Sequence, residues 1–256
     1  MLNSLSDLTT QVVVSYFLIF CRIGAAYMTM PALGEAYIST RIRLIAAIIT
    51  SIVIVPVVDN AFKGVHENVM IMTLRIFNEV LIGVIMGFLV KVLMATIGLC
   101  GIMISSQSGL SSAMMFDPNT DSQGVVEGNF LSAVVVVLIF VTDMHHHLLY
   151  GIVHSYKVFP LLHTINYEHL ANDISHLIGQ SFIMAFKMAS PHIVVGIILM
   201  FSAGILSRLM PNIQIFFLLM PIQILVSFTL MTLTLGSIIM WYFEFLSENI
   251  NKMFGL

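Results

Sequence analysis

The amino-acid sequence predicts an all-α protein: a multi-helix, hydrophobic integral membrane protein or a subunit buried in an apolar assembly. Of its 256 residues, 59% are hydrophobic and 9% are charged, whereas soluble domains have about 25% charged residues. The mean hydropathy of +1.01 also favours a protein that lies in a membrane or in an apolar assembly. The apolar residues form long continuous runs, which favours membrane-type helices. No repeat divides the chain, so we expect one domain over residues 1–256.

Charge and cysteine usage exclude several classes of protein. The formal net charge of −3 gives no basic surface for nucleic acid. Cys21 and Cys100 lie inside apolar runs, where cysteine usually acts as a small buried hydrophobe, so they indicate no redox compartment. The first residues contain Asp7 and no Lys or Arg, which is not typical of a cleaved signal peptide.

Three helices are predicted in the first part of the chain, over 12–33, 42–58 and 69–104. The third run has about 36 residues and would extend roughly 54 Å as a helix, far beyond a hydrocarbon core of ~30 Å. We therefore expect it to kink, split or protrude. Gly83 and Gly87 are spaced for close helix packing, although glycine is also frequent in membrane helices without that role.

A polar loop is predicted over 105–124, between two apolar runs. It has no Lys, Arg or Glu, and its serines, its glycines and the turn signal Asp117-Pro118 all disfavour a helix. Met114, Met115 and Phe116 lie in its middle, and such flexible apolar groups could form a soft seal that repacks when something passes. A surface loop whose apolar tip docks on a neighbouring helix fits these residues equally well.

The second half of the chain continues with further helices. The run 130–141 is short for a membrane span, and Asp143 is expected to cap the helix that follows it. Residues 157–176 are the most water-compatible stretch and are predicted to be a connector. A fifth helix over 177–206 is expected to break at Ser190-Pro191, a sixth over 213–245 contains Pro221, and the tail 247–256 is short and polar.

Basic residues are scattered through the apolar runs, so the positive-inside rule assigns no orientation. Six lie within or at the margins of these runs: Arg22, Arg43, Arg75, Lys91, Lys187 and Arg208. Each costs about 3 kcal/mol at the centre of a membrane helix, which favours helices packed mainly on protein. Glu79 lies one turn from Arg75 and is an expected partner, whereas Arg43 and Lys91 could instead extend toward lipid headgroups.

The histidines do not predict an enzyme. Asp143 and His147 would share a helix face and could bind a metal, but the chain has no HExxH, Walker A, Gly-x-Ser-x-Gly or GxGxxG motif, and consecutive histidines such as His145 and His146 point in different directions on a helix. We expect no metal site and no catalytic residue, and this segment is interpreted as the start of a helix.

A series of motifs follows the order and spacing of a known family. The motifs are Arg22-x-Gly24, Pro31-x-x-Gly34-Glu35, Arg41-x-Arg43-Leu44, Gly109-x-x-x-Ala113-Met114 with Pro118, Asp143-x-His145-His146 with Ser155 and Pro160, and Gly204-x-x-x-Arg208-x-x-Pro211 with Phe216 and Pro221. Together they resemble the FliR family of type III secretion export-gate proteins over nearly the whole chain. Gly34-Glu35 is closer to flagellar members than to the injectisome branch. Gln223 stands where that family usually has a basic residue.

The resemblance implies a non-enzymatic, pore-forming subunit of the flagellar export gate, without cofactor or metal. It would assemble with FliP-like and FliQ-like subunits, and with an FlhB-like subunit, in the inner membrane at the flagellar basal body. Unfolded export substrates would pass through this gate. The plug across its pore would contain Gly109, Leu110, Ser111, Ser112, Ala113, Met114, Met115, Phe116, Asp117 and Pro118. Assembly would depend on Arg22, Gly24, Pro31, Gly34, Glu35, Arg43, Asp143, His145, Gly204, Arg208, Pro211 and Pro221.

Alternative functions remain open at the level of sequence. A secondary transporter or channel would use the helices broken by Gly and Pro and the intramembrane charges as its substrate site, although no inverted repeat is evident. An intramembrane metalloenzyme lacks its motif. The injectisome homologue of the same gate is the third alternative.

Overall fold

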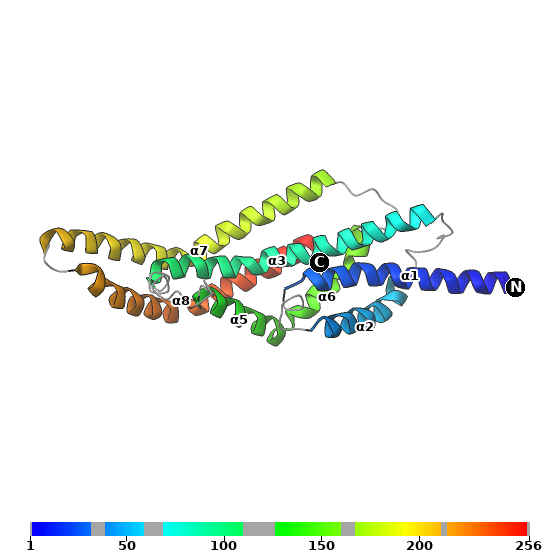
Figure 1. Cartoon of the computed structure of the whole chain (residues 1–256), viewed down its shortest axis with the longest axis horizontal. Helices are drawn as coiled ribbons and strands as arrows, with labels where there is room; N and C mark the ends of the chain where they lie inside the picture. The colour runs from blue at the N-terminus through cyan, green and yellow to red at the C-terminus, as the bar shows by residue number, and fades with distance from the viewer. Residues whose placement is uncertain are drawn as a thin grey trace. The chain divides into compact units, whose positions relative to one another are not determined.

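The computed structural model describes residues 2–31, 39–58, 69–109, 126–159, 167–210 and 214–254. All regular elements within these ranges are helices, which confirms the all-α prediction (Figure 1). They are α1 (Leu2–Thr29), α2 (Thr40–Val58), α3 (Val69–Ser108), α5 (Val126–Val141), α6 (Met144–Val158), α7 (Tyr167–Leu209) and α8 (Ile215–Phe254).

The helices extend further than the apolar runs suggested. The polar loop was expected to begin at Ser105, but α3 continues to Ser108, and the hydroxyls of Ser106 and Ser108 donate to carbonyl oxygens of the same helix. The connector expected over 157–176 is helical from Tyr167 onward. The tail after Ser247, expected to lie outside the last helix, belongs to α8 as far as Phe254. A polar composition therefore does not mark where backbone hydrogen bonding along a helix stops.

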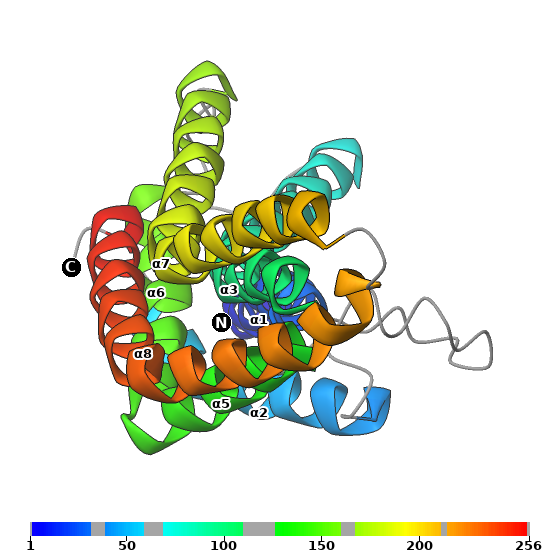
Figure 2. The ribbon, with the colours of Figure 1, turned by 90° about the vertical axis from the view of Figure 1, so that its left-hand side faces the viewer.

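The break expected at Ser190-Pro191 does not occur. The helix α7 runs through Pro191 without interruption over 43 residues. Proline removes one backbone hydrogen bond and bends a helix without having to end it, and α7 changes direction along its length in Figure 1. Pro221 likewise lies inside α8, which follows a curved path in Figure 2.

The long third run forms one helix instead of splitting. With 40 residues, α3 would measure about 60 Å at ~1.5 Å per residue, twice the thickness of a hydrocarbon core. Among the residues that the structure describes, four helices contain segments long and apolar enough to span a membrane: Val12–Thr29, Met70–Ser108, Glu168–Leu209 and Phe217–Met253. The pair α5 and α6 would supply a fifth if it were counted as one bent span.

The chain forms two compact units, and the predicted single domain stays a prediction. The first unit contains residues 1–92, 142–174 and 249–256, and here α2 packs along α1 and also contacts α6. Ile19, Ile23, Ala26 and Met30 follow the three-to-four residue spacing of one face of α1. The buried core of this unit consists of Leu18, Ile19, Ile23, Ala26, Tyr27, Met30, Ala47, Val58, Val90, Ile152 and Tyr156.

The second unit contains residues 93–141 and 175–248. Leu93, Ile97, Cys100 and Ile104 are fully buried and share one face of α3, as their spacing requires. The Tyr242 hydroxyl of α8 reaches the carbonyl oxygen of Leu93 at 3.4 Å. The apolar windows of α7 and α8 are only 22% and 17% buried within the chain, so most of their apolar surface needs lipid or another protein to cover it.

Candidate functional site

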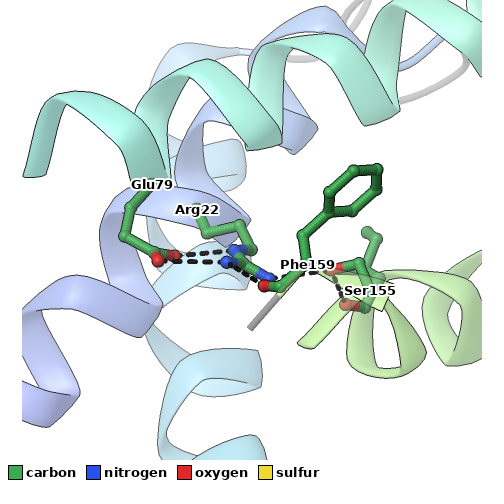
Figure 3. A network of polar contacts seen from close by, with 5 residues as sticks. Arg22, Glu79, Ser155 and Phe159 are labelled. Carbon is green, nitrogen blue, oxygen red and sulfur yellow. Dashed lines mark hydrogen bonds and ion pairs between the residues drawn. The ribbon is translucent and has the colours of Figure 1, made fainter. Parts of the chain in front are cut away.

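A buried ion pair joins α1 to α3 in the first unit (Figure 3). The Arg22 Nε donates to Glu79 Oε2 at 2.6 Å, and its Nη2 donates to Glu79 Oε1 at 3.0 Å. The two side chains are 0% and 1% exposed. This two-point geometry is the strongest way for a carboxylate to hold a guanidinium, so the charge of Arg22 is neutralised where water cannot reach it.

The remaining donors of Arg22 point to α6 and the residue that follows it. Its Nη1 donates to the Ser155 hydroxyl and its Nη2 to the Phe159 carbonyl oxygen, both at 3.2 Å. The guanidinium carbon also lies 3.8 Å from the centre of the Tyr156 ring, a distance typical of a cation–π contact. One side chain from α1 thus links α3 with α6 (Figure 3).

This network corrects one interpretation of the sequence. Glu79 was assigned to Arg75, its neighbour on the same helix, but both of its carboxylate oxygens bond to Arg22 from a different helix. Arg22 does fulfil the expectation that a charge within an apolar run faces protein. By contrast, Lys91, Lys187 and Arg208 are exposed within this chain.

Close packing of α1 on α3 lies beside the ion pair. A Cβ atom on Gly83 would clash with the carbonyl oxygen of Arg22, and one on Gly87 would lie 2.8 Å from the carbonyl oxygen of Ala26. These are distances that real Cβ atoms essentially never adopt. The small-residue spacing therefore serves close helix contact, as it does in many membrane proteins.

The other residues proposed for assembly differ in how far they are exposed. Gly24, Pro31 and Arg43 are partly buried, while Gly204, Arg208 and Pro221 are exposed. Arg208 lies in the last turn of α7, where its charge complements the negative end of the helix dipole. Gly34, Glu35 and Pro211 lie outside the described residues, as do Leu110 to Pro118 of the predicted plug.

Asp143 occupies the N-cap position of α6 but does not cap the helix through its side chain. Its backbone is left-handed, with φ of 57°, and no side-chain cap hydrogen bond forms, whereas capping residues usually have an extended backbone. The capping role was therefore wrong, although the helix does start there. One of its carboxylate oxygens instead lies 3.6 Å from Nδ1 of His146.

The neighbouring histidines also differ from expectation, because the rings of His145 and His146 are only 4.1 Å apart. Ligand atoms of Asp143, His145 and His146 all lie within 4.8 Å of one another. Two nitrogen ligands on one zinc ion, each about 2.1 Å from it, lie roughly 3.4 Å apart in tetrahedral geometry. These three side chains are therefore spaced closely enough to hold a metal ion together, and the expectation of no metal site stays a prediction.

Gly109 is the one residue of the predicted plug that the structure describes. It follows α3 directly and is left-handed, with φ of +72°, a conformation that favours glycine at the end of a helix. The Gln223 side chain of α8 packs against Gly109. The Nε2 of Gln223 donates to the carbonyl oxygen of Gln107 at 2.5 Å. Gln223 therefore satisfies one of the carbonyl groups left free at the end of α3.

A second polar contact holds the same end of α3. The Ser108 hydroxyl donates to Glu127 Oε1 of α5 at 2.8 Å. Just beside it, Gly101 approaches Gly128 so closely that a Cβ atom on Gly101 would clash with the Gly128 backbone. The last turn of α3 and Gly109 are thus held by α5 and α8. Sequence reasoning missed Glu127 and gave Gln223 no role, since neither belongs to a recognisable motif.

The comparisons with known proteins agree with one another. Residues 13–249 match the family described as bacterial export proteins, family 1. The chain is 31% identical to the flagellar biosynthetic protein FliR of Caulobacter vibrioides, over 87% of this chain and 89% of that protein. It is 26% identical to the protein of the same name from Bacillus subtilis, over 93% of this chain and 90% of that protein. It is also 23% identical to the Yop proteins translocation protein T of Yersinia pestis, over 86% of this chain and 85% of that protein.

Proposed function

Since the chain belongs to the bacterial export proteins, family 1, we propose that it is a structural, pore-forming subunit of the flagellar type III protein export gate. The match over residues 13–249 carries this proposal. The FliR relatives in Caulobacter vibrioides and Bacillus subtilis are named as flagellar biosynthetic proteins. That naming supports the flagellar gate over the injectisome form that the Yersinia relative suggests.

The proposed partners are FliP-like and FliQ-like subunits, with an FlhB-like subunit beside them. Partners of this kind would cover apolar helix surface that the chain leaves open, which includes Phe182, Ile198, Phe217 and Leu225, each at least 54% exposed. A lipid environment would cover the same side chains, but Lys187 and Arg208 are exposed on the same helix, α7, and charges are costly in lipid. Contact with protein therefore accounts for both the apolar and the charged surface.

The loop after Gly109 is proposed as the plug of the pore. It connects α3 with α5 in sequence, and Gln223 and Glu127 hold the last turn of α3, which precedes it. A loop fixed at its base can return to the same closed position after a substrate has passed, while Met114, Met115 and Phe116 can repack. Unfolded export substrates are the proposed cargo, and the inner membrane at the flagellar basal body is the proposed location. The role is non-enzymatic.

Expression with and without the proposed partners tests this function. A tagged chain produced alone should be degraded or should aggregate, because its apolar surface lacks a cover. Co-expression with FliP-like and FliQ-like subunits should stabilise it, since whatever binds only the folded state shifts the folding equilibrium. Both subunits should then co-purify in mild detergent. A monodisperse, protease-resistant chain without partners that transports a solute in vesicles would refute the gate and support the secondary transporter.

A further inference from the structure

A buried histidine in the second unit lacks the hydrogen bonds that its ring requires. His192 of α7 is 2% exposed, and within the described part of the chain neither of its ring nitrogens has a hydrogen-bond partner. A neutral imidazole carries one donor nitrogen and one acceptor nitrogen. Leaving both without partners in an apolar environment is costly, and buried polar groups of this kind are commonly satisfied by ordered water.

The ring lies beside a small cavity where α3, α7 and α8 meet. His192 lines it together with Gln107 of α3 and with Gln223 and Ser227 of α8, and all four residues belong to the second unit. The other described residues of the lining are glycine or apolar. The cavity has room for about one water molecule. It therefore places polar groups from three helices around a space of water size.

Direct contacts among the three helices hold the walls of this cavity. The Gln223 Nε2 of α8 donates to the Gln107 carbonyl oxygen of α3 at 2.5 Å. Gly196 of α7, which also lines the cavity, lies so close to α3 that a Cβ atom there would clash with the Gln107 side chain. Since α7 and α8 each touch α3 directly, the site is formed before any ligand enters it.

The chemistry of the lining selects the ligand. The Gln107 and Gln223 amides and the Ser227 hydroxyl can each donate and accept a hydrogen bond, as a water molecule can. A bound zinc ion takes thiolate, carboxylate or several imidazole ligands, and the described lining residues offer one imidazole and no thiolate or carboxylate. A cavity with room for about one water molecule also excludes larger organic ligands.

We propose that one ordered water molecule occupies this cavity and bridges His192 to the amide and hydroxyl groups of α3 and α8. The water bonds a ring nitrogen of His192 and at least one of the other three polar side chains. It thereby links α7 to the α3–α8 pair by hydrogen bonds in a region where most packing is apolar, as interhelical polar contacts do in membrane proteins. This site does not rest on the export function proposed above.

A density map that resolves ordered water tests the site directly. The preparation is the complex purified in mild detergent, or the chain alone if no other subunit co-purifies. The map should show one water peak in the cavity, within about 3.2 Å of a His192 ring nitrogen and of a polar atom of Gln107, Gln223 or Ser227. An empty cavity, a metal ion or a side chain of another subunit in that position would each overturn the proposal.

Thermal stability of the same preparation gives a second test whose sign distinguishes a wet cavity from a dry one. His192→Leu should lower the thermal midpoint by roughly 2–4 °C, because the water loses its partner on α7 and the polar groups on α3 and α8 lose their bridge. In a dry cavity the same substitution would remove two unsatisfied nitrogens and raise the midpoint. His192→Gln keeps a donor and an acceptor, so it should lower the midpoint less than His192→Leu.

His176→Leu is the matched control, because it makes the same substitution at an exposed position of α7. It should leave the midpoint unchanged to within about 1 °C. A His192→Leu midpoint equal to or above that of the wild type would overturn the water bridge. If His192→Leu does not assemble, the wild-type density map decides the question.

Discussion

Glu79 of α3 accepts hydrogen bonds from Arg22 of α1 with both of its carboxylate oxygens, although 57 residues separate the two in sequence. Neither side chain is accessible to water. A buried ion pair of this kind costs desolvation energy when it forms, but removal of one partner leaves an uncompensated charge in an apolar environment. The pair therefore disfavours any arrangement of α1 and α3 that would separate Arg22 from Glu79.

Arg22→Ala or Glu79→Ala should each destabilise the protein by about 3–5 kcal/mol, because the remaining charge is buried without a partner. The double variant Arg22→Met with Glu79→Leu should lose less than either single change, since it buries no charge at all. The fraction of the co-purified complex that stays intact after heating to a series of temperatures ranks the three variants by stability. Lys91→Ala, at an exposed position on α3, is the control. Single variants no worse than the double would rule out the ion-pair role.

Gly87→Ala should push α1 away from α3 and lower the free energy of unfolding by about 1–3 kcal/mol. The reason is that the new Cβ meets a backbone carbonyl oxygen, which cannot rotate away. Gly98→Ala is a matched control on the same helix, where the nearest atom, Ser132 Oγ, would lie 3.6 Å from the Cβ. It should be neutral, or stabilise by about 1 kcal/mol through helix propensity. Equal thermal stability of the two variants would contradict the assigned close contact.

Arg208→Ala should reduce recovery of the FliP-like subunit roughly fivefold, because an arginine at an interface commonly contributes on the order of 1 kcal/mol or more. Arg208 is exposed at the end of α7, so the substitution removes no packing within the chain. Arg208→Lys should have a smaller effect, since it keeps the charge but loses the planar donor group. Quantitative pull-down measures the ratio, with Lys157→Ala, at an exposed position on α6, as the control. Unchanged recovery would indicate that Arg208 extends toward headgroups instead.

Deletion of Leu110 to Asp117 should leave the gate assembled but permeable to ions without substrate, because the soft apolar groups proposed to seal the pore are then absent. Replacing Met114, Met115 and Phe116 with serine keeps the loop length and should have the same effect. Ser111→Ala with Ser112→Ala serves as the control within the loop. Conductance in planar bilayers is the measurement. A deleted gate as tight as the intact one would refute the seal and favour a loop docked on a neighbouring helix.

Much of the fold was predictable because apolar length and composition are local properties. Every predicted helix exists among the described residues. The first ends at Thr29, short of the predicted residue 33, whereas α3, α7 and α8 continue into polar residues that were expected to lie outside them. Ser105 to Ser108 and the residues after Ser247 remain helical because their backbone groups still find partners along the helix. Pro191 remained inside α7, because a proline removes one hydrogen bond of a helix that otherwise makes several dozen.

The sequence by itself determined that this chain is all-α, strongly apolar and a member of one export family, and that Arg22 requires a partner shielded from water. The tertiary structure alone decided which partner that is. The sequence leaves several carboxylates as candidate partners of Arg22. It also favours Arg75, one helical turn away, as the partner of Glu79. Only the approach of α1 to α3 at Gly83 and Gly87 brings Arg22 and Glu79 into contact. Burial makes this contact decisive, because a charge pair removed from water is stabilised only by the donors and acceptors that lie beside it.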